Sequence, residues 1–204
     1  MQVVLRLIVA IIFGLNLGAL SALWFGGMID GGPKIGNAID TDGWRSDWSI
    51  GSESANPYVR ARVARNGLMG LRKEEAVYFI KTEDQRGARL TEDCDYLVRG
   101  GVLPAAWWSI TLYDADNRLP MNEDAALSFD QTKAERLGGV DWSFMISATA
   151  PADLPDPAWV SSRAGGAFDL TLRLYQPSAE LLDDPVAALT PPTIERLSCG
   201  EGSD

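Results

Sequence analysis

The sequence predicts a mainly β protein, an antiparallel β-sandwich of jelly-roll type, with an N-terminal transmembrane helix and one short amphipathic helix. Three observations support this prediction. Residues 7–29 contain no charged side chain. Beyond residue 75, several short runs are rich in β-branched and aromatic residues, and some alternate apolar with polar side chains. Clusters of Gly, Pro, Asp and Asn separate these runs, as turns separate the strands of a sandwich.

The uncharged run is long enough to be a membrane anchor. As a helix rising about 1.5 Å per residue, it would span about 34 Å, against a hydrocarbon core of about 30 Å. A cleaved signal peptide is the alternative, with small residues at Ala19, Ser21 and Ala22. The apolar run, however, is longer than the about 7–15 residues of a usual signal core and continues past those sites.

The charges beside this run indicate its orientation. Arg6 precedes the run, whereas Asp30, Asp40 and Asp42 follow it. The positive-inside rule therefore places the amino end in the cytoplasm. We expect a single-pass inner-membrane protein whose C-terminal domain lies in the periplasm and whose helix contacts the membrane. A protein secreted to the periplasm after cleavage is the alternative.

Composition excludes several kinds of chemistry. The chain has 18 Lys and Arg, 28 Asp and Glu, and no His. Because phosphate binding needs a basic surface, we expect no nucleic-acid partner. Without His there is no Ser-His-Asp or Cys-His nucleophile and no His-ligated zinc. We therefore expect no cofactor and no metal, and no catalytic residue is assigned.

The chain is expected to have three parts. Residues 1–29 form the anchor, residues 30–56 a Gly-, Ser- and Asp-rich linker, and residues 57–204 the β domain. Asn56 followed by Pro57 resembles a helix N-cap with Pro at the first helical position. The short helix that starts there should end at Gly67.

Five segments of the β domain have the character of strands. In FDLTLRLY, Phe168, Leu170, Leu172 and Leu174 should face the core, because successive side chains of a strand point to opposite faces. The tail after this segment is expected to be mostly irregular because it contains several prolines. The expected strands are Ala76–Ile80, Tyr96–Val98, Trp107–Tyr113, Trp142–Ser147 and Phe168–Tyr175.

Polar and aromatic side chains on the outward faces of two of these strands are candidates for ligand binding. A tryptophan or tyrosine ring suits stacking on a sugar, and an Arg beside an Asp suits a polar ligand. These side chains either line a pocket or form a solvated face with an ion pair worth less than about 1 kcal/mol. The candidates are Trp107, Tyr113, Asp169, Arg173 and Tyr175.

Carboxylates offer two further chemistries, each with a simpler alternative. Residues 114–124 are rich in oxygen ligands suited to calcium, but Asp and Asn are also ordinary turn residues, and Arg118 stands where glycine would help a calcium loop. A pair of carboxyl groups hydrolyses glycans in many enzymes. The carboxylates available for such a pair are Asp95, Asp114, Asp116, Asp141 and Asp169.

The two cysteines, Cys94 and Cys199, lie far apart and belong to no metal-binding motif. In an exported domain such a pair favours a disulfide, which would tie the C-terminal tail to the middle of the domain. Two reduced, buried thiols are the alternative.

Three segments together resemble the bacterial domain of unknown function 1214 family. They are NPYVRARVARNGLMGLRKEEAVYF, LPAAWWSITLYDADNRL and FDLTLRLYQP, within a similarity that extends from about Trp44 to Cys199. The resemblance implies an antiparallel, jelly-roll-like sandwich and a place in the cell envelope, and relatives carry cysteines at corresponding places. Relatives often have Trp-Leu-Pro before the last strand, whereas this chain has Trp159-Val160-Ser161. The resemblance implies no established activity.

We therefore expect a non-catalytic binding or accessory module that recognises an envelope protein or polymer. A carboxylate-dependent hydrolase acting on envelope glycan is the alternative.

Overall fold

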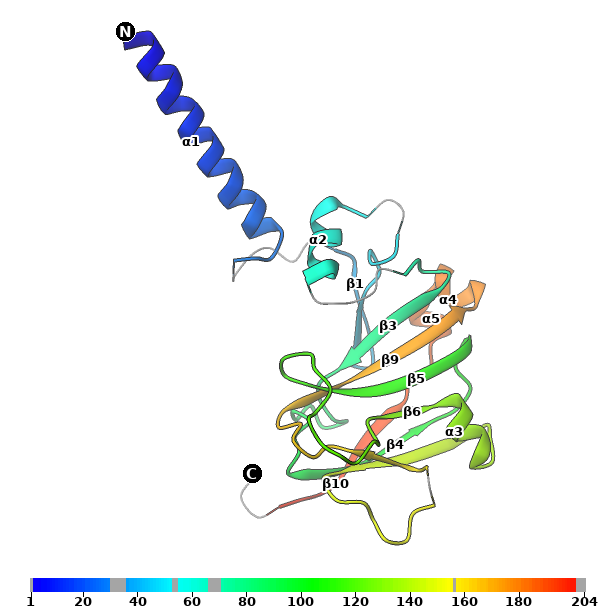
Figure 1. The fold of residues 1–204 in the computed structure, drawn as a ribbon. Coiled ribbons are helices and arrows are strands. Elements are labelled where there is room, and N and C mark those ends of the chain that lie inside the picture. Colours follow the sequence, from blue (N-terminus) through cyan, green and yellow to red (C-terminus); the bar gives the residue numbers. More distant parts are fainter. Residues whose placement is uncertain (1, 30–35, 53–54, 66–70, 156, 201–204) are drawn as a thin grey trace. The chain divides into compact units, whose positions relative to one another are not determined.

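The computed structural model describes the chain apart from residues 1, 30–35, 53–54, 66–70, 156 and 201–204 (Figure 1). The chain forms two compact units, each composed of two segments. One unit comprises Met1–Asn37 and Asp47–Arg72, and the other comprises Ala38–Ser46 and Lys73–Asp204.

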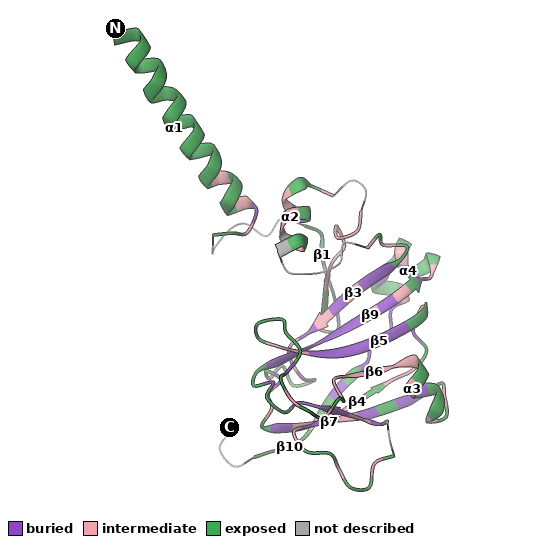
Figure 2. Cartoon of the chain, in the orientation of Figure 1, coloured by how far each residue is buried: buried purple, intermediate pink, exposed green. Residues whose placement is uncertain are grey.

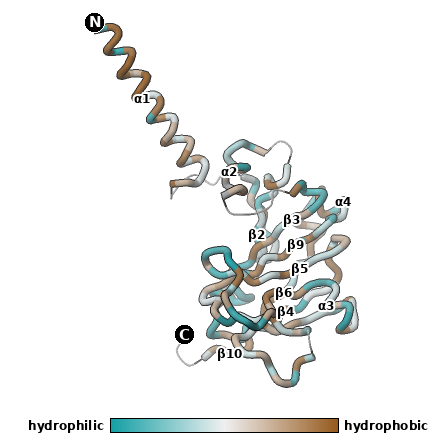
Figure 3. The backbone as a smooth tube through the Cα atoms, in the orientation of Figure 1, coloured by the Kyte–Doolittle hydropathy of each residue, from teal (hydrophilic) through white to brown (hydrophobic). Residues whose placement is uncertain are grey.

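The first unit contains the two helices expected from the sequence. Helix α1 (Gln2–Phe25) has no buried residue and is long and apolar enough to cross a membrane (Figures 2 and 3). Helix α2 (Pro57–Arg65) begins as expected, because the N–H of Tyr58 donates to Asn56 Oδ1 at 2.9 Å. The expected end of this helix at Gly67 lies outside the described residues.

The second unit is a β-sandwich of two sheets, which confirms the predicted fold class. The six-stranded sheet has the order β1-β2-β3-β9-β5-β6 and the four-stranded sheet has the order β10-β4-β7-β8. Strand β7 pairs with β8 in parallel, so the four-stranded sheet is mixed, whereas β4 is antiparallel to both β10 and β7, and β9 is antiparallel to both β3 and β5. The strands are β1 (Ala38–Thr41), β2 (Trp44–Asp47), β3 (Ala76–Lys81), β4 (Cys94–Gly100), β5 (Ala105–Asp114), β6 (Ser128–Asp130), β7 (Trp142–Ser147), β8 (Trp159–Ser161), β9 (Phe168–Pro177) and β10 (Thr193–Cys199).

The core lies between the two sheets and is rich in aromatic rings. The centroids of Trp108 and Trp142 are 4.4 Å apart, and those of Phe129 and Phe144 are 4.5 Å apart. Because Trp108 and Phe129 belong to one sheet and the other two rings to the second, this cluster joins the sheets. The four inward residues predicted for β9 are all fully buried. Strong period-two alternation therefore identified the central strand correctly.

Three short helices lie between or after the strands: α3 (Gln131–Arg136), α4 (Ala179–Asp183) and α5 (Pro185–Ala188). Helix α3 follows β6 directly, and Asp130 caps it by accepting the N–H of Lys133 at 3.0 Å. Gly138 and Gly139 follow α3 with φ values of 117° and 103°, which favour glycine. The chain turns there toward β7.

Two sequence expectations are corrected by the strands. The tail is not irregular, because β10 runs antiparallel to β4 and completes the four-stranded sheet. Part of the expected linker 30–56 also belongs to a sheet, since β1 and β2 extend the six-stranded sheet beside β3. Trp44 of β2 is fully buried, and its indole N–H donates to the Pro192 carbonyl at 2.8 Å. The ring therefore fastens this segment to the domain.

Candidate binding face

The five candidate ligand-binding residues lie on one face of the six-stranded sheet, the face opposite the core. Strands β5 and β9 are paired so that Trp107 lies opposite Tyr175 and Tyr113 opposite Asp169. On β9, Asp169, Arg173 and Tyr175 alternate with the buried leucines, so they share the outward side. We call Trp107, Tyr113, Asp169, Arg173 and Tyr175, together with their neighbours Tyr78 and Thr111, the Arg173 face.

Arg173 is the centre of this face. Its guanidinium donates to Thr111 Oγ1 at 3.0 Å and to the hydroxyl of Tyr113. It also lies 5.3 Å from the ring centroid of Tyr113 and 6.0 Å from that of Tyr78. Among the described residues, no carboxylate lies within ion-pair distance of Arg173. The face therefore holds a partly buried positive charge whose contacts are hydroxyls and aromatic rings.

The ion pair considered between Arg173 and Asp169 does not form. Asp169 is 8% exposed and accepts instead the hydroxyl of Thr171 at 3.3 Å. Burial raises the pKa of Asp169 to about 6, with Asp114 adding to the effect and Thr171 and Arg89 opposing it. Near neutral pH this carboxyl group is thus easier to protonate than an ordinary aspartate.

Two further aromatic rings, those of Trp107 and Tyr175, lie on the same face of the sheet. The Trp107 and Tyr175 centroids are 5.4 Å apart, and the indole N–H of Trp107 donates to Thr132 Oγ1 at 3.3 Å. Trp107 is 37% exposed, unlike the core tryptophans. Burial, with the nearby Tyr175, raises the pKa of Tyr78, although Arg173 opposes the shift. Tyr78 therefore remains neutral at physiological pH.

Tyr78 is a member of the face that sequence reasoning missed. Its strand was predicted, but only the register shows that Tyr78 lies directly opposite Arg173 across β3 and β9. The alternation within Ala76–Lys81 places Tyr78 on the side opposite Val77 and Phe79. The alternation in the sequence would have assigned Tyr78 to the outward face of the sheet. It would not have shown that Tyr78 lies opposite Arg173.

Carboxylate side chains of the oxygen-rich stretch 114–124 accept hydrogen bonds that stabilise turns and loops. Asp114 Oδ1 accepts the N–H groups of Asp116 and Arg118, each at 2.9 Å. Asp124 accepts the Ser161 hydroxyl at 2.6 Å and forms an ion pair with Arg163 at 3.4 Å. No group of three metal-binding side chains is found among the residues that the structure describes.

Asp95 is another of the carboxylates considered for glycan hydrolysis. Asp95 lines a hollow of about 620 Å³ together with Glu92 and Asp93, on a different part of the domain. Asp95 accepts the Ser198 hydroxyl at 3.0 Å, and Glu92 accepts the N–H groups of Ala164 and Gly166 at 2.9 and 3.0 Å. Two of the three carboxylates thus support the local fold.

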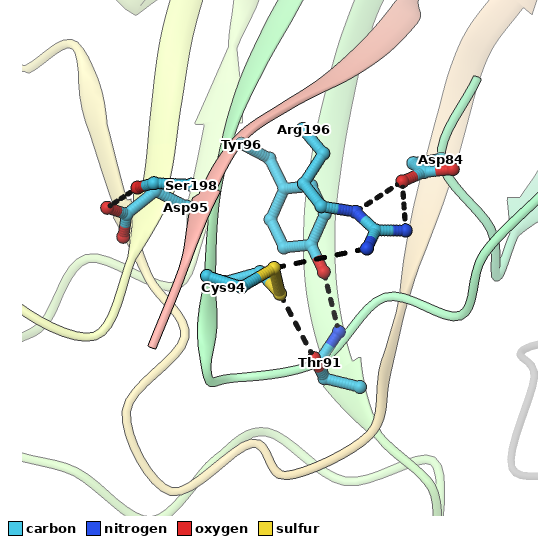
Figure 4. Close-up of a disulfide and its surroundings, with 8 residues drawn as sticks. Asp84, Thr91, Cys94, Asp95, Tyr96, Arg196 and Ser198 are labelled. Carbon is cyan, nitrogen blue, oxygen red and sulfur yellow. Dashed lines mark hydrogen bonds and ion pairs between the residues drawn. A yellow bond between two sulfur atoms is a disulfide. The ribbon is translucent and has the colours of Figure 1, made fainter. Parts of the chain in front are cut away.

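The disulfide lies at the edge of the four-stranded sheet. Cys94 and Cys199 are joined, with their Cα atoms 3.9 Å apart in directly paired positions of β4 and β10 (Figure 4). The hydroxyl of Tyr96 accepts the N–H of Thr91 at 2.9 Å beside it. The bond therefore fixes the last strand of the domain to its only sheet neighbour in the described structure.

A buried ion pair that the sequence did not indicate lies next to the disulfide. Arg196 Nη2 and Nε are 2.6 and 2.7 Å from Asp84 Oδ2, and the Asp84 side chain is 1% exposed (Figure 4). Burial alone would raise the pKa of Asp84, but the N–H groups of Ala88 and Arg86 and the Arg196 guanidinium outweigh it and lower the pKa. Asp84 is therefore a charged group at neutral pH.

A solved structure of similar fold agrees with the sandwich. The VPA0106 protein from Vibrio parahaemolyticus is similar with a TM-score of 0.56 and 23% identity, over 71% of this chain and 36% of that one. The chain thus spans about a third of that protein's length. An uncharacterized protein from Burkholderia cenocepacia matches with a TM-score of 0.40 and 13% identity, over 60% of this chain and 29% of that one. No curated protein matches the chain.

A family model described as "Protein of unknown function (DUF1214)" matches residues 75–179. The match covers 105 of the 204 residues and includes β3 through β9, with both central strands of the Arg173 face. The strands β1, β2 and β10 lie outside it. The chain belongs to the DUF1214 family.

Proposed function

We propose that this protein is a non-catalytic binding module of the bacterial envelope, held in the inner membrane by α1, whose β domain faces the periplasm. The apolar helix, the charges beside it and the disulfide support this placement. The domain binds through the Arg173 face, and its ligand is an envelope glycan that carries carboxylate or phosphate groups.

The single observation that carries this proposal is the unpaired guanidinium among aromatic rings. A guanidinium that has no carboxylate partner keeps N–H groups for an anionic ligand, and charge-assisted hydrogen bonds are about twice as strong as neutral ones. Tyr and Trp rings provide flat surfaces that pack against sugar rings. The contacts with Thr111 and Tyr113 hold Arg173 in place before a ligand arrives.

The charge of the domain restricts the ligand. In this orientation Arg6 lies on the cytoplasmic side. The rest of the chain has 17 basic and 28 acidic residues, a net charge of −11. The net negative charge of the domain repels a densely charged polyanion. A glycan with widely spaced acidic groups interacts mainly with the charges close to its binding site, because salt screens charges beyond about 8 Å under physiological conditions.

Replacing Arg173 by Gln is expected to weaken glycan binding about tenfold, because a charge-assisted hydrogen bond is worth about 1.5–3 kcal/mol. The measurement is co-sedimentation of the full-length chain, in nanodiscs of neutral lipid, with purified cell-wall sacculi. The matched control is Arg118→Gln, which removes the same charge from an exposed turn. Equal binding by the two variants, or no binding by the unmodified chain, would overturn the proposal.

A hydrolase acting on envelope glycan is the second candidate, favoured by the pKa of about 6 at Asp169 with Asp114 nearby. Against it, Asp169 is nearly buried and Asp114 Oδ1 holds a turn. An assay for soluble sugar released from the same sacculi distinguishes a hydrolase from a binding module. Release of soluble sugar that Asp169→Asn abolishes would replace the binding proposal with the enzyme.

A further inference from the structure

A hollow of about 270 Å³ lies next to α3, and none of its lining residues belongs to the Arg173 face. Its floor is apolar and includes Trp108, Trp142 and Leu103, each at most 5% exposed. The volume is just below the about 300–1,000 Å³ typical of ligand pockets. The hollow therefore has room for a small molecule with a compact hydrocarbon body.

Two valines at the mouth are unusually exposed. Val102 is 75% and Val140 66% exposed, and both line the hollow. Val140 is placed there by the turn through Gly138 and Gly139 after α3, where positive φ values favour glycine. Exposed apolar side chains beside an apolar floor indicate a surface that a ligand would cover.

Glu135 is the one charged residue among the described residues that line the hollow. Glu135 lines it, and its Oε1 accepts a hydrogen bond from Gln131 Nε2 at 3.0 Å, while no ion pair of Glu135 is found among the described residues. Asp141 Oδ1 lies 3.7 Å from the position that a Cβ on Gly101 would take, beside the same lining. The lining contains no Lys or Arg. Two exposed carboxylates thus stand near an apolar hollow without a cation among its lining residues.

We infer that this hollow binds a small organic ammonium ion, with its hydrocarbon body against Trp108, Trp142 and Leu103 and its charged nitrogen toward Glu135 and Asp141. Charge complementarity selects this class, because a neutral compound would leave the carboxylates unused and an organic anion would be repelled. The site is independent of the proposed glycan binding, since it shares no residue with the Arg173 face.

Three probes with one ring and different charges test this site. Isothermal titration calorimetry measures the binding of cyclohexylammonium, cyclohexanol and cyclohexanecarboxylate to the full-length chain in neutral-lipid nanodiscs, with empty nanodiscs as the blank. The ammonium is expected to bind tightest and the carboxylate weakest. A double variant, Glu135→Gln with Asp141→Asn, is expected to reduce the advantage of the ammonium over the alcohol about fivefold, the effect of losing exposed ion pairs.

The matched control is Glu123→Gln, which removes an exposed carboxylate that does not line the hollow. This variant should bind the ammonium as the unmodified chain does. Equal binding of ammonium and alcohol, or an unchanged preference in the double variant, would overturn the assignment of a cation. Failure of all three probes to bind would overturn the site itself.

Discussion

A double variant, Cys94→Ala with Cys199→Ala, is expected to lose up to about 4.7 kcal/mol of its free energy of unfolding, the value that the chain-entropy model gives for a loop of about 100 residues. The two cysteines are 105 residues apart in the sequence, so their bond greatly restricts the unfolded chain. In the folded domain, the bond also retains β10, which pairs with β4 at the edge of the sheet.

Urea unfolding of the full-length chain in detergent micelles, followed by tryptophan fluorescence, measures this loss. Dithiothreitol should shift the midpoint of the unmodified chain to that of the double variant, and should leave the double variant unchanged. A double variant with the midpoint of the unmodified chain would show that the bond does not stabilise the domain.

Replacing Arg196 by Met is expected to lower the free energy of unfolding by about 3–5 kcal/mol at pH 7, because it leaves the Asp84 carboxylate buried without its partner. The matched control is Arg45→Met. Arg45 pairs with Asp40 at 3.1 Å, but both side chains are more than half exposed, so the loss there should stay below about 1 kcal/mol.

The effect of Arg196→Met should depend on pH in a defined direction. The pKa of Asp84 is lowered in the folded protein, so its contribution is present above the unfolded pKa of about 3.9 and is lost as pH falls through the lower folded value. Without Arg196 a main cause of the lowering is removed. The difference between variant and unmodified chain should therefore be largest near neutral pH and shrink in acid. A difference independent of pH would contradict the charged state of Asp84.

The sequence predicted the parts of the fold that have strong periodicity. In β9, large apolar side chains recur at every second position, and the four predicted inward residues are fully buried. Strand β10 was missed because few of its side chains face the core, with Ile194 fully buried, and prolines precede it. Its place in the sheet depends on pairing with β4, about a hundred residues earlier, which local patterns do not encode.

The candidate site was predicted to a similar degree. Alternation alone put Asp169, Arg173 and Tyr175 on one side of a strand, as the structure has them. It did not indicate that Arg173 would contact Thr111 and Tyr113 rather than Asp169, because this choice depends on the register between β5 and β9. The Asp84–Arg196 pair joins residues 112 positions apart, and no sequence signal linked them.

We propose that α1 holds the β domain on the periplasmic side of the inner membrane, because binding to an envelope glycan requires this location and a disulfide is favoured there. Protease treatment of spheroplasts, followed by detection of the chain in carbonate-washed membranes, tests it most directly. Without protease, we expect the full-length chain in the carbonate-washed membranes. External protease should digest the β domain in spheroplasts but not in intact cells, whose outer membrane excludes the protease. A β domain that stays intact until the inner membrane is broken would contradict a periplasmic location of the domain.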